Sequence, residues 1–225
     1  MFFDFHVHNT QLTDDAKRLG YNGIALIQSS RDYDKPKGIN SQDDFSIWNG
    51  VEIYAKNPDD LRKKVQKFRE RSDVLIVNGG DIKINRAACE DPRVDILAHP
   101  YKNRRDSGIN HVLAKKASEN NVAIELNINS IIKTRLSLRA KILSQFRQII
   151  KLQRKFKFPL IITSNAYSEY DLRTPEDIIA FAGCLEMTHD EIISSLSKNP
   201  ADIIKRSKIR KNVIVQGART IEQDD

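Results

Sequence analysis

The chain has 225 residues, with 40% hydrophobic and 30% charged residues and a net charge of +7, which is the composition of a globular protein of one domain or two small ones. It contains no apolar run of the roughly 18 residues that a membrane span needs. The segment Met1 to His6 lacks the basic start and long apolar stretch of a signal peptide, so we expect a cytoplasmic protein.

Seven short β-branched or apolar runs alternate with helical patterns along almost the whole chain. Several of these runs are continuously apolar, which is typical of parallel strands that are covered on both faces. No glycine-rich dinucleotide-binding motif accompanies them, so a closed or nearly closed barrel is favoured over an open sheet. The predicted strands are Phe2–Val7, Gly23–Ile27, Ile47–Tyr54, Val74–Val77, Val94–Ala98, Val122–Leu126 and Leu160–Thr163.

Four helix starts carry recognisable capping signals. Asn57, Thr174 and Asn199 each precede a proline, with acidic residues in the turn that follows. Thr188 and Glu191 have the spacing of a capping box. We therefore predict that a helix begins at each of these four places.

A long helix is predicted from Thr134 to Phe156. Its apolar residues form a broad stripe that starts at Leu136 and Leu138 and continues to Phe156. The opposite face gathers four cations, Arg147, Lys151, Arg154 and Lys155. We expect this helix to pack along one side and to offer its basic face to RNA or to an acidic protein.

The fold class predicted from this order is α/β, a distorted (β/α) barrel of about seven parallel strands in one domain over residues 1–204. Beyond Lys205 the pattern fades into a basic and polar end, so we expect residues 205–225 to form a mobile tail. Cys89 and Cys184 lie far apart in apolar surroundings, and we expect both in the core rather than in a zinc site or a disulfide.

The positive charge is concentrated in one region. From Tyr101 to Lys157 there are 14 Lys and Arg against three acids, so this stretch carries +11 and the remainder of the chain −4. Such a one-sided field attracts a polyanion, either a nucleic acid or an acidic protein surface. A solvated helix face is the alternative explanation, and the charge pattern alone leaves both open.

Candidate functional side chains stand where predicted strands end, which is where a (β/α) barrel carries its site. His6 and His8 alternate along the first strand and therefore share a face, as a pair of metal ligands requires. Glu52, His99 and Glu125 follow at the ends of the third, fifth and sixth strands, and Ser164-Asn165-Ala166-Tyr167 ends the seventh.

This order of motifs resembles the polymerase-and-histidinol-phosphatase (PHP) superfamily of metal-dependent phosphoesterases, which fold as a distorted seven-stranded barrel. Further blocks, such as Val77-Asn78-Gly79-Gly80-Asp81, Asp91 to Pro100 and Thr163 to Tyr167, resemble one branch of it, protein component 3 of archaeal ribonuclease P. The resemblance extends from about Phe2 to Pro200. It implies a subunit that supports removal of the 5′ leader of precursor tRNA, a cleavage that the RNA of the complex carries out with Mg²⁺.

The departure from active PHP enzymes lies at the last strand. The resemblance implies an Asp-x-His there, and this chain has Asn165 and Tyr167, a neutral amide and a phenol. Neither is a good ligand for divalent metals. We therefore predict that the motif residues form a degenerate site without a metal cluster, catalytic residues or a cofactor, and a single weakly held metal at His6 and His8 is the alternative that the sequence leaves open. His6 and His8 are then buried, hydrogen-bonded groups, and Asp4 and Glu125 pair with Arg or Lys at the rim.

Two functions remain in contention at this point. The first is a non-catalytic ribonuclease P subunit, and the second is a PHP-type phosphoesterase that uses His6, His8, Glu52, His99 and Glu125. The resemblance implies ribonuclease P RNA, precursor tRNA and the other protein components as partners, with component 2 in a two-plus-two assembly and no membrane. The RNA contacts predicted from the branch motifs are Arg86, Arg105, His111, Lys115 and Arg173. For Arg86 and Arg173, pairing with a carboxylate such as Asp81 or Asp171 is the alternative.

Overall fold

The structure is a computed structural model that describes residues 1–33, 45–211, 213–215 and 218–219. Among these residues, no helix combines the length and the apolar character that crossing a bilayer would demand.

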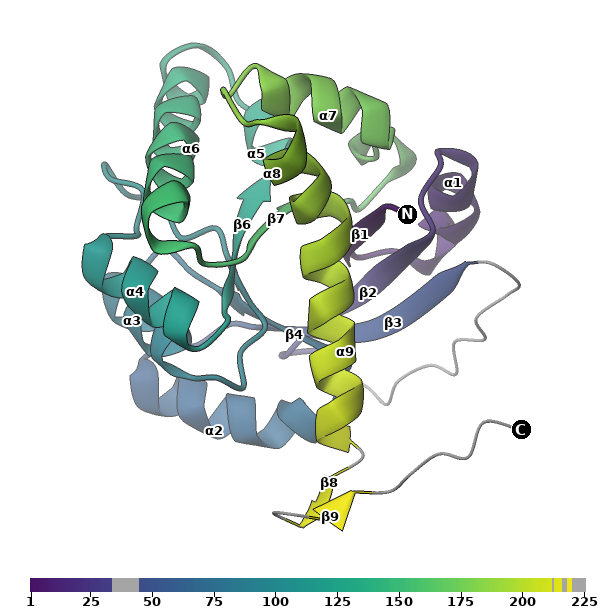
Figure 1. Cartoon of the computed structure of the whole chain (residues 1–225), viewed down its shortest axis with the longest axis vertical. Helices are drawn as coiled ribbons and strands as arrows, with labels where there is room; N and C mark the ends of the chain where they lie inside the picture. Colours follow the sequence, from purple (N-terminus) through teal and green to yellow (C-terminus); the bar gives the residue numbers. More distant parts are fainter. Residues whose placement is uncertain (34–44, 212, 216–217, 220–225) are drawn as a thin grey trace.

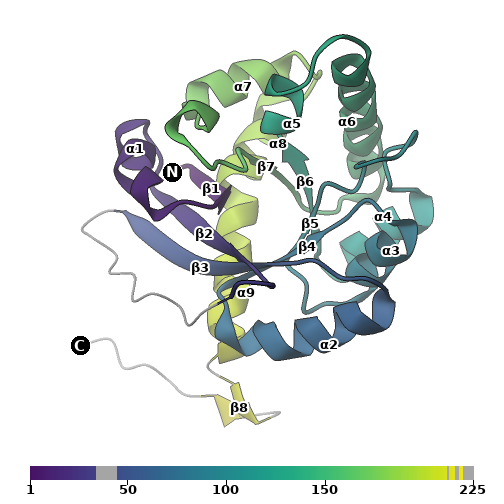
Figure 2. The ribbon, with the colours of Figure 1, turned by 180° about the vertical axis from the view of Figure 1, so that it is seen from behind.

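All seven predicted strands are present, and they form one parallel sheet in chain order. The sheet curls so that its two edges meet (Figures 1 and 2). Val7 and Ala166 form a parallel bridge there, and the amide of His8 donates to the Ala166 carbonyl. The fold is therefore a nearly closed (β/α) barrel, as predicted. The strands are β1 Phe3–Val7, β2 Gly23–Ser29, β3 Ser46–Ile53, β4 Val74–Asn78, β5 Ile96–Ala98, β6 Ala123–Asn127 and β7 Leu160–Thr163.

Helices surround the barrel (Figure 1). The predicted caps at Asn57, Thr174 and Thr188 are confirmed, because each side chain accepts the backbone amide three residues later. Such caps satisfy amides that have no partner within the helix. The helices are α1 Thr13–Arg18, α2 Pro58–Phe68, α3 Ile82–Glu90, α4 His111–Glu119, α5 Asn129–Ile132, α6 Leu136–Phe156, α7 Pro175–Gly183, α8 His189–Ile193 and α9 Asn199–Lys211.

Alternate residues of the strands pack inside the barrel or outward against the helices. In β4, Val74 and Ile76 belong to the inner cluster, whereas Leu75 and Val77 belong to the outer one. The inner cluster also contains Ile203 of α9, so this helix closes the end of the barrel opposite the strand carboxyl ends. The carboxyl end is thereby left as the open mouth at which polar side chains collect.

The C-terminal region differs from expectation in two ways. A helix begins at Asn199 as predicted, but a π-helical turn, η4 (Ser194–Lys198), joins α8 to α9 without a break, and the Asn199 side-chain amide donates to the Leu160 carbonyl. Helix α9 continues past residue 204 to Lys211, and β8 (Val213–Val215) pairs with β9 (Ala218–Arg219). The rest of the predicted tail, residues 212, 216–217 and 220–225, lies outside the described residues.

A buried ion cluster holds the end of α9 against the barrel. Asp95, directly before β5, is fully buried and accepts hydrogen bonds from Arg69, from Arg210 and from the amide of Leu75. The helix continues past residue 204 because Arg210 has this partner and because Ser207 is also buried. Of the cysteines, Cys89 is buried as expected, but Cys184 is exposed at the end of α7.

Candidate functional site at the barrel mouth

Five side chains predicted from the strand ends meet at the carboxyl end of the barrel. The rings of His6 and His8 lie 4.9 Å apart, and the rings of His6 and His99 lie 5.8 Å apart. Glu125 of β6 and Glu52 of β3 approach His6 from opposite sides. Phe3 and Phe5 belong to the inner cluster, so strict alternation along β1 would point His6 outward. The pairing register of β1 shifts between Asp4 and Val7, and His6 therefore lies inside. The prediction that these residues share one site is confirmed.

His6 is buried between two carboxylates. Its Nδ1 lies 2.5 Å from Oε1 of Glu125, and its Nε2 lies 3.9 Å from Oε2 of Glu52. Burial alone would lower the pKa of His6, but the two carboxylates outweigh it and raise this pKa to about 10. The same attraction outweighs burial at both carboxyl groups, so the pKa of Glu52 and that of Glu125 lie below the ordinary value.

His8 is neutral and is fixed by the residues that replace the expected ligands. Burial and the charge of His6 lower the pKa of His8 to about 4. Its Nε2 lies 2.6 Å from the Asn165 side-chain oxygen, so this nitrogen carries the proton. Tyr167 stacks on the His8 ring at 3.9 Å and 13°. Asn165 and Tyr167 therefore orient His8 by a hydrogen bond and by stacking.

Two of these side chains depend on unusual backbone. His99 and Asn165 have φ angles of 49° and 53°, in the left-handed region that residues other than glycine seldom adopt. His99 directly follows β5, and Asn165 lies two residues beyond the end of β7. The barrel thus holds both residues in a costly conformation exactly where their side chains enter the mouth, as is common at functional sites.

Asp4 and Glu125 do not pair with Arg or Lys, contrary to expectation. Asp4 accepts the amides of His6 and Ser164, and burial raises its pKa to about 6. Glu125 accepts from His6 and from the Thr163 hydroxyl. The reason is topological: both side chains lie inside the packed structure, where the long basic side chains of the rim do not reach.

The donor set does not fit the polynuclear metal centre of PHP enzymes. Two triads, His6–His8–Glu52 and His6–His99–Glu125, bring ligand atoms within 4.8 Å, but both depend on His6. Both groups lack the charged ligand of the last strand, because Asn165 stands where the resemblance implies an aspartate. Among the described residues, the buried side-chain atoms at these strand ends that have no hydrogen bond include Nε2 of His6, Oε2 of Glu125, Nδ2 of Asn127 and Oγ of Ser164.

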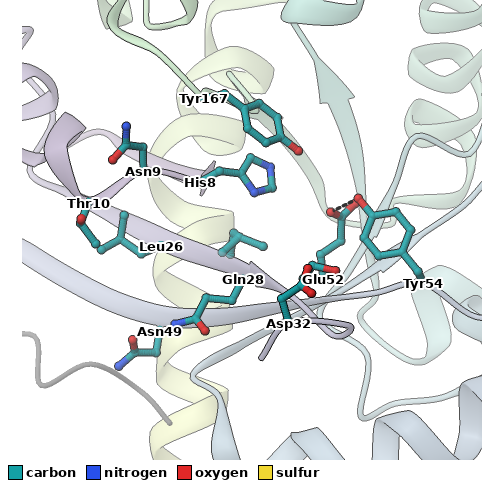
Figure 3. A pocket seen from close by; sticks show the side chains of 12 residues that line it. His8, Asn9, Thr10, Leu26, Gln28, Asp32, Asn49, Glu52, Tyr54 and Tyr167 are labelled. Atoms are coloured by element: carbon teal, nitrogen blue, oxygen red, sulfur yellow. Dashed lines mark hydrogen bonds between the residues drawn. The ribbon is translucent and has the colours of Figure 1, made fainter. Parts of the chain in front are cut away.

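A cavity of about 630 Å³ opens beside His8 and Tyr167 (Figure 3). Glu52 and Asp32 line it, and Tyr54 donates a hydrogen bond to Glu52 across its wall. None of the described residues that line this cavity is a Lys or Arg.

The residues predicted to contact RNA fall into two places. Arg86 lies on α3, Arg105 precedes α4, and His111 and Lys115 share one face of α4, which packs beside α3 (Figures 1 and 2). All four side chains are exposed. Arg173 lies before α7, on another flank of the barrel, and is only partly exposed. Arg173 therefore lies apart from the other four predicted RNA contacts.

The alternative ion pairs for these arginines are also not as expected. Arg86 pairs with Glu90 on its own helix at 2.9 Å, and Arg173 donates to the carbonyls of Tyr170 and Leu172. Asp81 instead caps α3, and Asp171 pairs with Lys133. Local helix geometry decides the outcome for Arg86, because residues four apart on a helix are neighbours.

The basic face of α6 is exposed as predicted, but half of it is already engaged. Arg154 makes two hydrogen bonds to the Glu191 carboxylate and a third to the Glu186 carbonyl, and Arg147 donates to the Cys184 carbonyl. These contacts attach α6 to the α7–α8 connection. Lys151 and Lys155 have no carboxylate partner among the described residues, so they are the cations of this face that are left for another molecule.

Sequence reasoning missed the side chains that orient the two glutamates. Asn78 and Tyr54 donate to Glu52 at 2.7 and 2.6 Å, and Thr163 donates to Glu125 at 2.6 Å. All three lie at strand ends, and this position was the feature of the sequence that could have indicated them. They were overlooked because an amide or a hydroxyl at a strand end carries no distinctive spacing.

The fold and the site together define a class of protein: a PHP-like barrel whose histidines and glutamates form an ion-paired network closed by an amide and a phenol. The chain belongs to the ribonuclease P subunit p30 family, whose model matches residues 1–212.

Curated relatives agree with this assignment. The chain is 46% identical to ribonuclease P protein component 3 of Methanothermobacter thermautotrophicus, over 99% of this chain and 96% of the relative. It is 43% identical to component 3 of Methanococcoides burtonii, over 98% and 94%. A chain in a cryo-EM structure of archaeal ribonuclease P with mature tRNA matches with a TM-score of 0.82 and 31% identity, over 99% of both chains.

Proposed function

We propose that this chain is a non-catalytic protein subunit of cytoplasmic ribonuclease P, which supports RNA-catalysed removal of the 5′ leader from precursor tRNA by binding RNA and partner proteins. The observation that carries this proposal is the barrel mouth, where Asn165 and Tyr167 hold His8 and where His6 is ion-paired. Its chemistry is that of a rigid structural network, while the family and the similarity to a chain in a tRNA-bound ribonuclease P supply the biological setting.

The flank formed by α3, the loop before α4, and α4 is the proposed RNA surface. Arg105 and His111 are exposed there and have no carboxylate partner among the described residues, while Lys115 is 3.9 Å from Glu119. Asn85 holds this surface in place by donating to the carbonyls of Pro100 and Gly108. Cations on a fixed framework suit the phosphate backbone of a structured RNA, which is recognised largely by shape.

The proposed assembly contains ribonuclease P RNA, precursor tRNA and the other protein components, with component 2 as the direct partner in a two-plus-two arrangement. In this proposal the protein holds no metal, and the Mg²⁺ of the reaction belongs to the RNA. Lys151 and Lys155 of α6 are a second contact surface, for RNA or for an acidic partner. Lys151, Lys155 and most cations of the proposed RNA surface lie between Tyr101 and Lys157, the stretch that carries the concentrated positive charge.

Reconstitution of the holoenzyme with and without this subunit tests the proposal. Cleavage of precursor tRNA should fall when the subunit is omitted and should survive His8→Ala, since His8 holds no metal and touches no substrate in this scheme. The competing function is a PHP-type phosphoesterase. Stoichiometric metal in the purified chain, together with phosphoesterase turnover that His8→Ala abolishes, would establish it and overturn the proposal.

A further inference from the structure

The apolar stripe of α6 continues beyond the core that it packs against. Ile142, Phe146 and Ile149 are buried, but every residue of the segment 135–141 is exposed. Within and just before it, Leu136 is 90% exposed, Leu138 is 50% exposed and Ile132 is 37% exposed. These are three of the nine large hydrophobic side chains that are exposed among the described residues. Three exposed large apolar side chains within seven residues make this segment a candidate interaction surface.

A cavity lies against this segment and gives it shape. It has a volume of about 370 Å³ and is bounded by α6 and by the loop that follows β5. Leu138, Ile142 and Tyr101 supply apolar wall, and Thr134 and Ser130 supply hydroxyls. Leu138 is thus both exposed and part of the cavity wall, so the cavity opens on the exposed segment.

The rim of this cavity is positively charged and not neutralised. Lys102 and Lys141 line the cavity, and Arg135 stands at the start of α6. None of the three pairs with a carboxylate among the described residues. Lys133 is different, because it pairs with Asp171. Unpaired cations around an apolar centre are complementary to carboxylates around an apolar side chain.

The exposed aliphatic side chains of this segment favour a protein over RNA as the molecule that binds here. A phosphate backbone does not bury leucine, and single-stranded RNA is held mainly by stacking on aromatic rings. The aromatic side chain in this cavity, Tyr101, is buried and donates to Ser130, so it offers no free face to a base. Leu136 and Leu138 instead suit the apolar centre of a protein interface.

We propose that the segment 132–141 and the adjoining cavity dock an acidic segment of a partner protein, which inserts one bulky apolar side chain between α6 and the loop after β5. Lys102, Lys141 and Arg135 then pair with carboxylates that flank the inserted side chain. The proposal rests on the proposed function only in that the partner is another protein of the complex. The docking surface adjoins the proposed RNA surface, because Lys102 and Arg105 lie on the same loop between β5 and α4.

Leu138→Lys separates the two kinds of occupant, because it removes apolar surface and adds a positive charge. Each purified ribonuclease P protein component, and separately the ribonuclease P RNA transcript, is titrated onto the full chain. We expect the dissociation constant for one protein component to rise roughly tenfold or more, and that for RNA to stay the same or fall. Ile209→Lys on α9, an exposed apolar residue elsewhere, is the matched control and should change neither.

Two further variants keep the test decisive. Leu136→Ser alters a side chain that has almost no contacts, so it should weaken the same protein complex without lowering the melting temperature. Lys141→Glu should weaken that complex more at low salt than at high salt. If protein binding is unchanged by Leu138→Lys and Leu136→Ser, or if only RNA binding weakens, the docking surface is refuted. Because binding is measured without tRNA cleavage, this failure is distinct from failure of the proposed function.

Discussion

Glu125→Gln tests the ion pair on which the interpretation of the barrel mouth depends. Glu125 is fully buried, and its Oε1 lies 2.5 Å from His6 Nδ1 and 2.6 Å from the Thr163 hydroxyl. Glutamine has nearly the same shape and can still accept from Thr163, but it carries no charge. The pKa of His6 should then fall from about 10 toward or below 6.5, because burial is opposed only by Glu52.

The expected loss of stability follows from the size of the pKa shift of His6. The pKa of His6 lies well above the ordinary value of 6.5, and each unit corresponds to about 1.4 kcal/mol. The pair therefore stabilises the folded protein by on the order of 4 kcal/mol at neutral pH. Since the folded pKa is the higher one, this contribution is complete below the unfolded pKa of 6.5 and is lost as the pH rises through about 10.

Urea unfolding of the wild type and of Glu125→Gln, measured between about pH 6 and about pH 10, gives the required comparison. The difference in unfolding free energy should be largest near pH 6 and should shrink steadily toward pH 10. Glu119→Gln is the matched control, because Glu119 is exposed and pairs with Lys116 at the surface; it should leave the unfolding free energy nearly unchanged at every pH. A difference that does not change with pH would show that His6 is not an imidazolium in the folded protein.

Three other outcomes are expected. Treating the isolated chain with a chelator should leave its urea midpoint unchanged, and a clear drop would reveal a bound metal. Reversing Lys151 and Lys155 to Glu should weaken binding to RNA or to an acidic component at low salt without lowering the melting temperature; unchanged binding to both would remove the basic face from the proposal. Asp95→Asn should lower the melting temperature by roughly 6–12 °C, from a loss of about 3 kcal/mol at the Arg69 and Arg210 cluster. Melting at the wild-type temperature would mean that this cluster does not hold α9.

The strands and the members of the site could be predicted because their signals are local. Parallel strands covered on both faces are continuously apolar, and the polar residues that end them, such as His6, Glu52 and Glu125, must meet at one end of a barrel. The amide and the phenol at Asn165 and Tyr167 were visible as departures from a ligand pattern. Their chemistry was therefore open to inference before any distance was known.

What those residues do with one another was decided by the tertiary structure. That His6 takes up a proton, that Asn165 and Tyr167 fix His8, and that Asp4 avoids the basic rim depend on burial and on separations of a few ångströms, which no spacing in the sequence encodes. The same holds for α6. Its stripe indicates a packed helix along its whole length, yet only the fold shows that the core ends near Ile142 and leaves Leu136 and Leu138 exposed, because the extent of a core is set by the elements that lie against it.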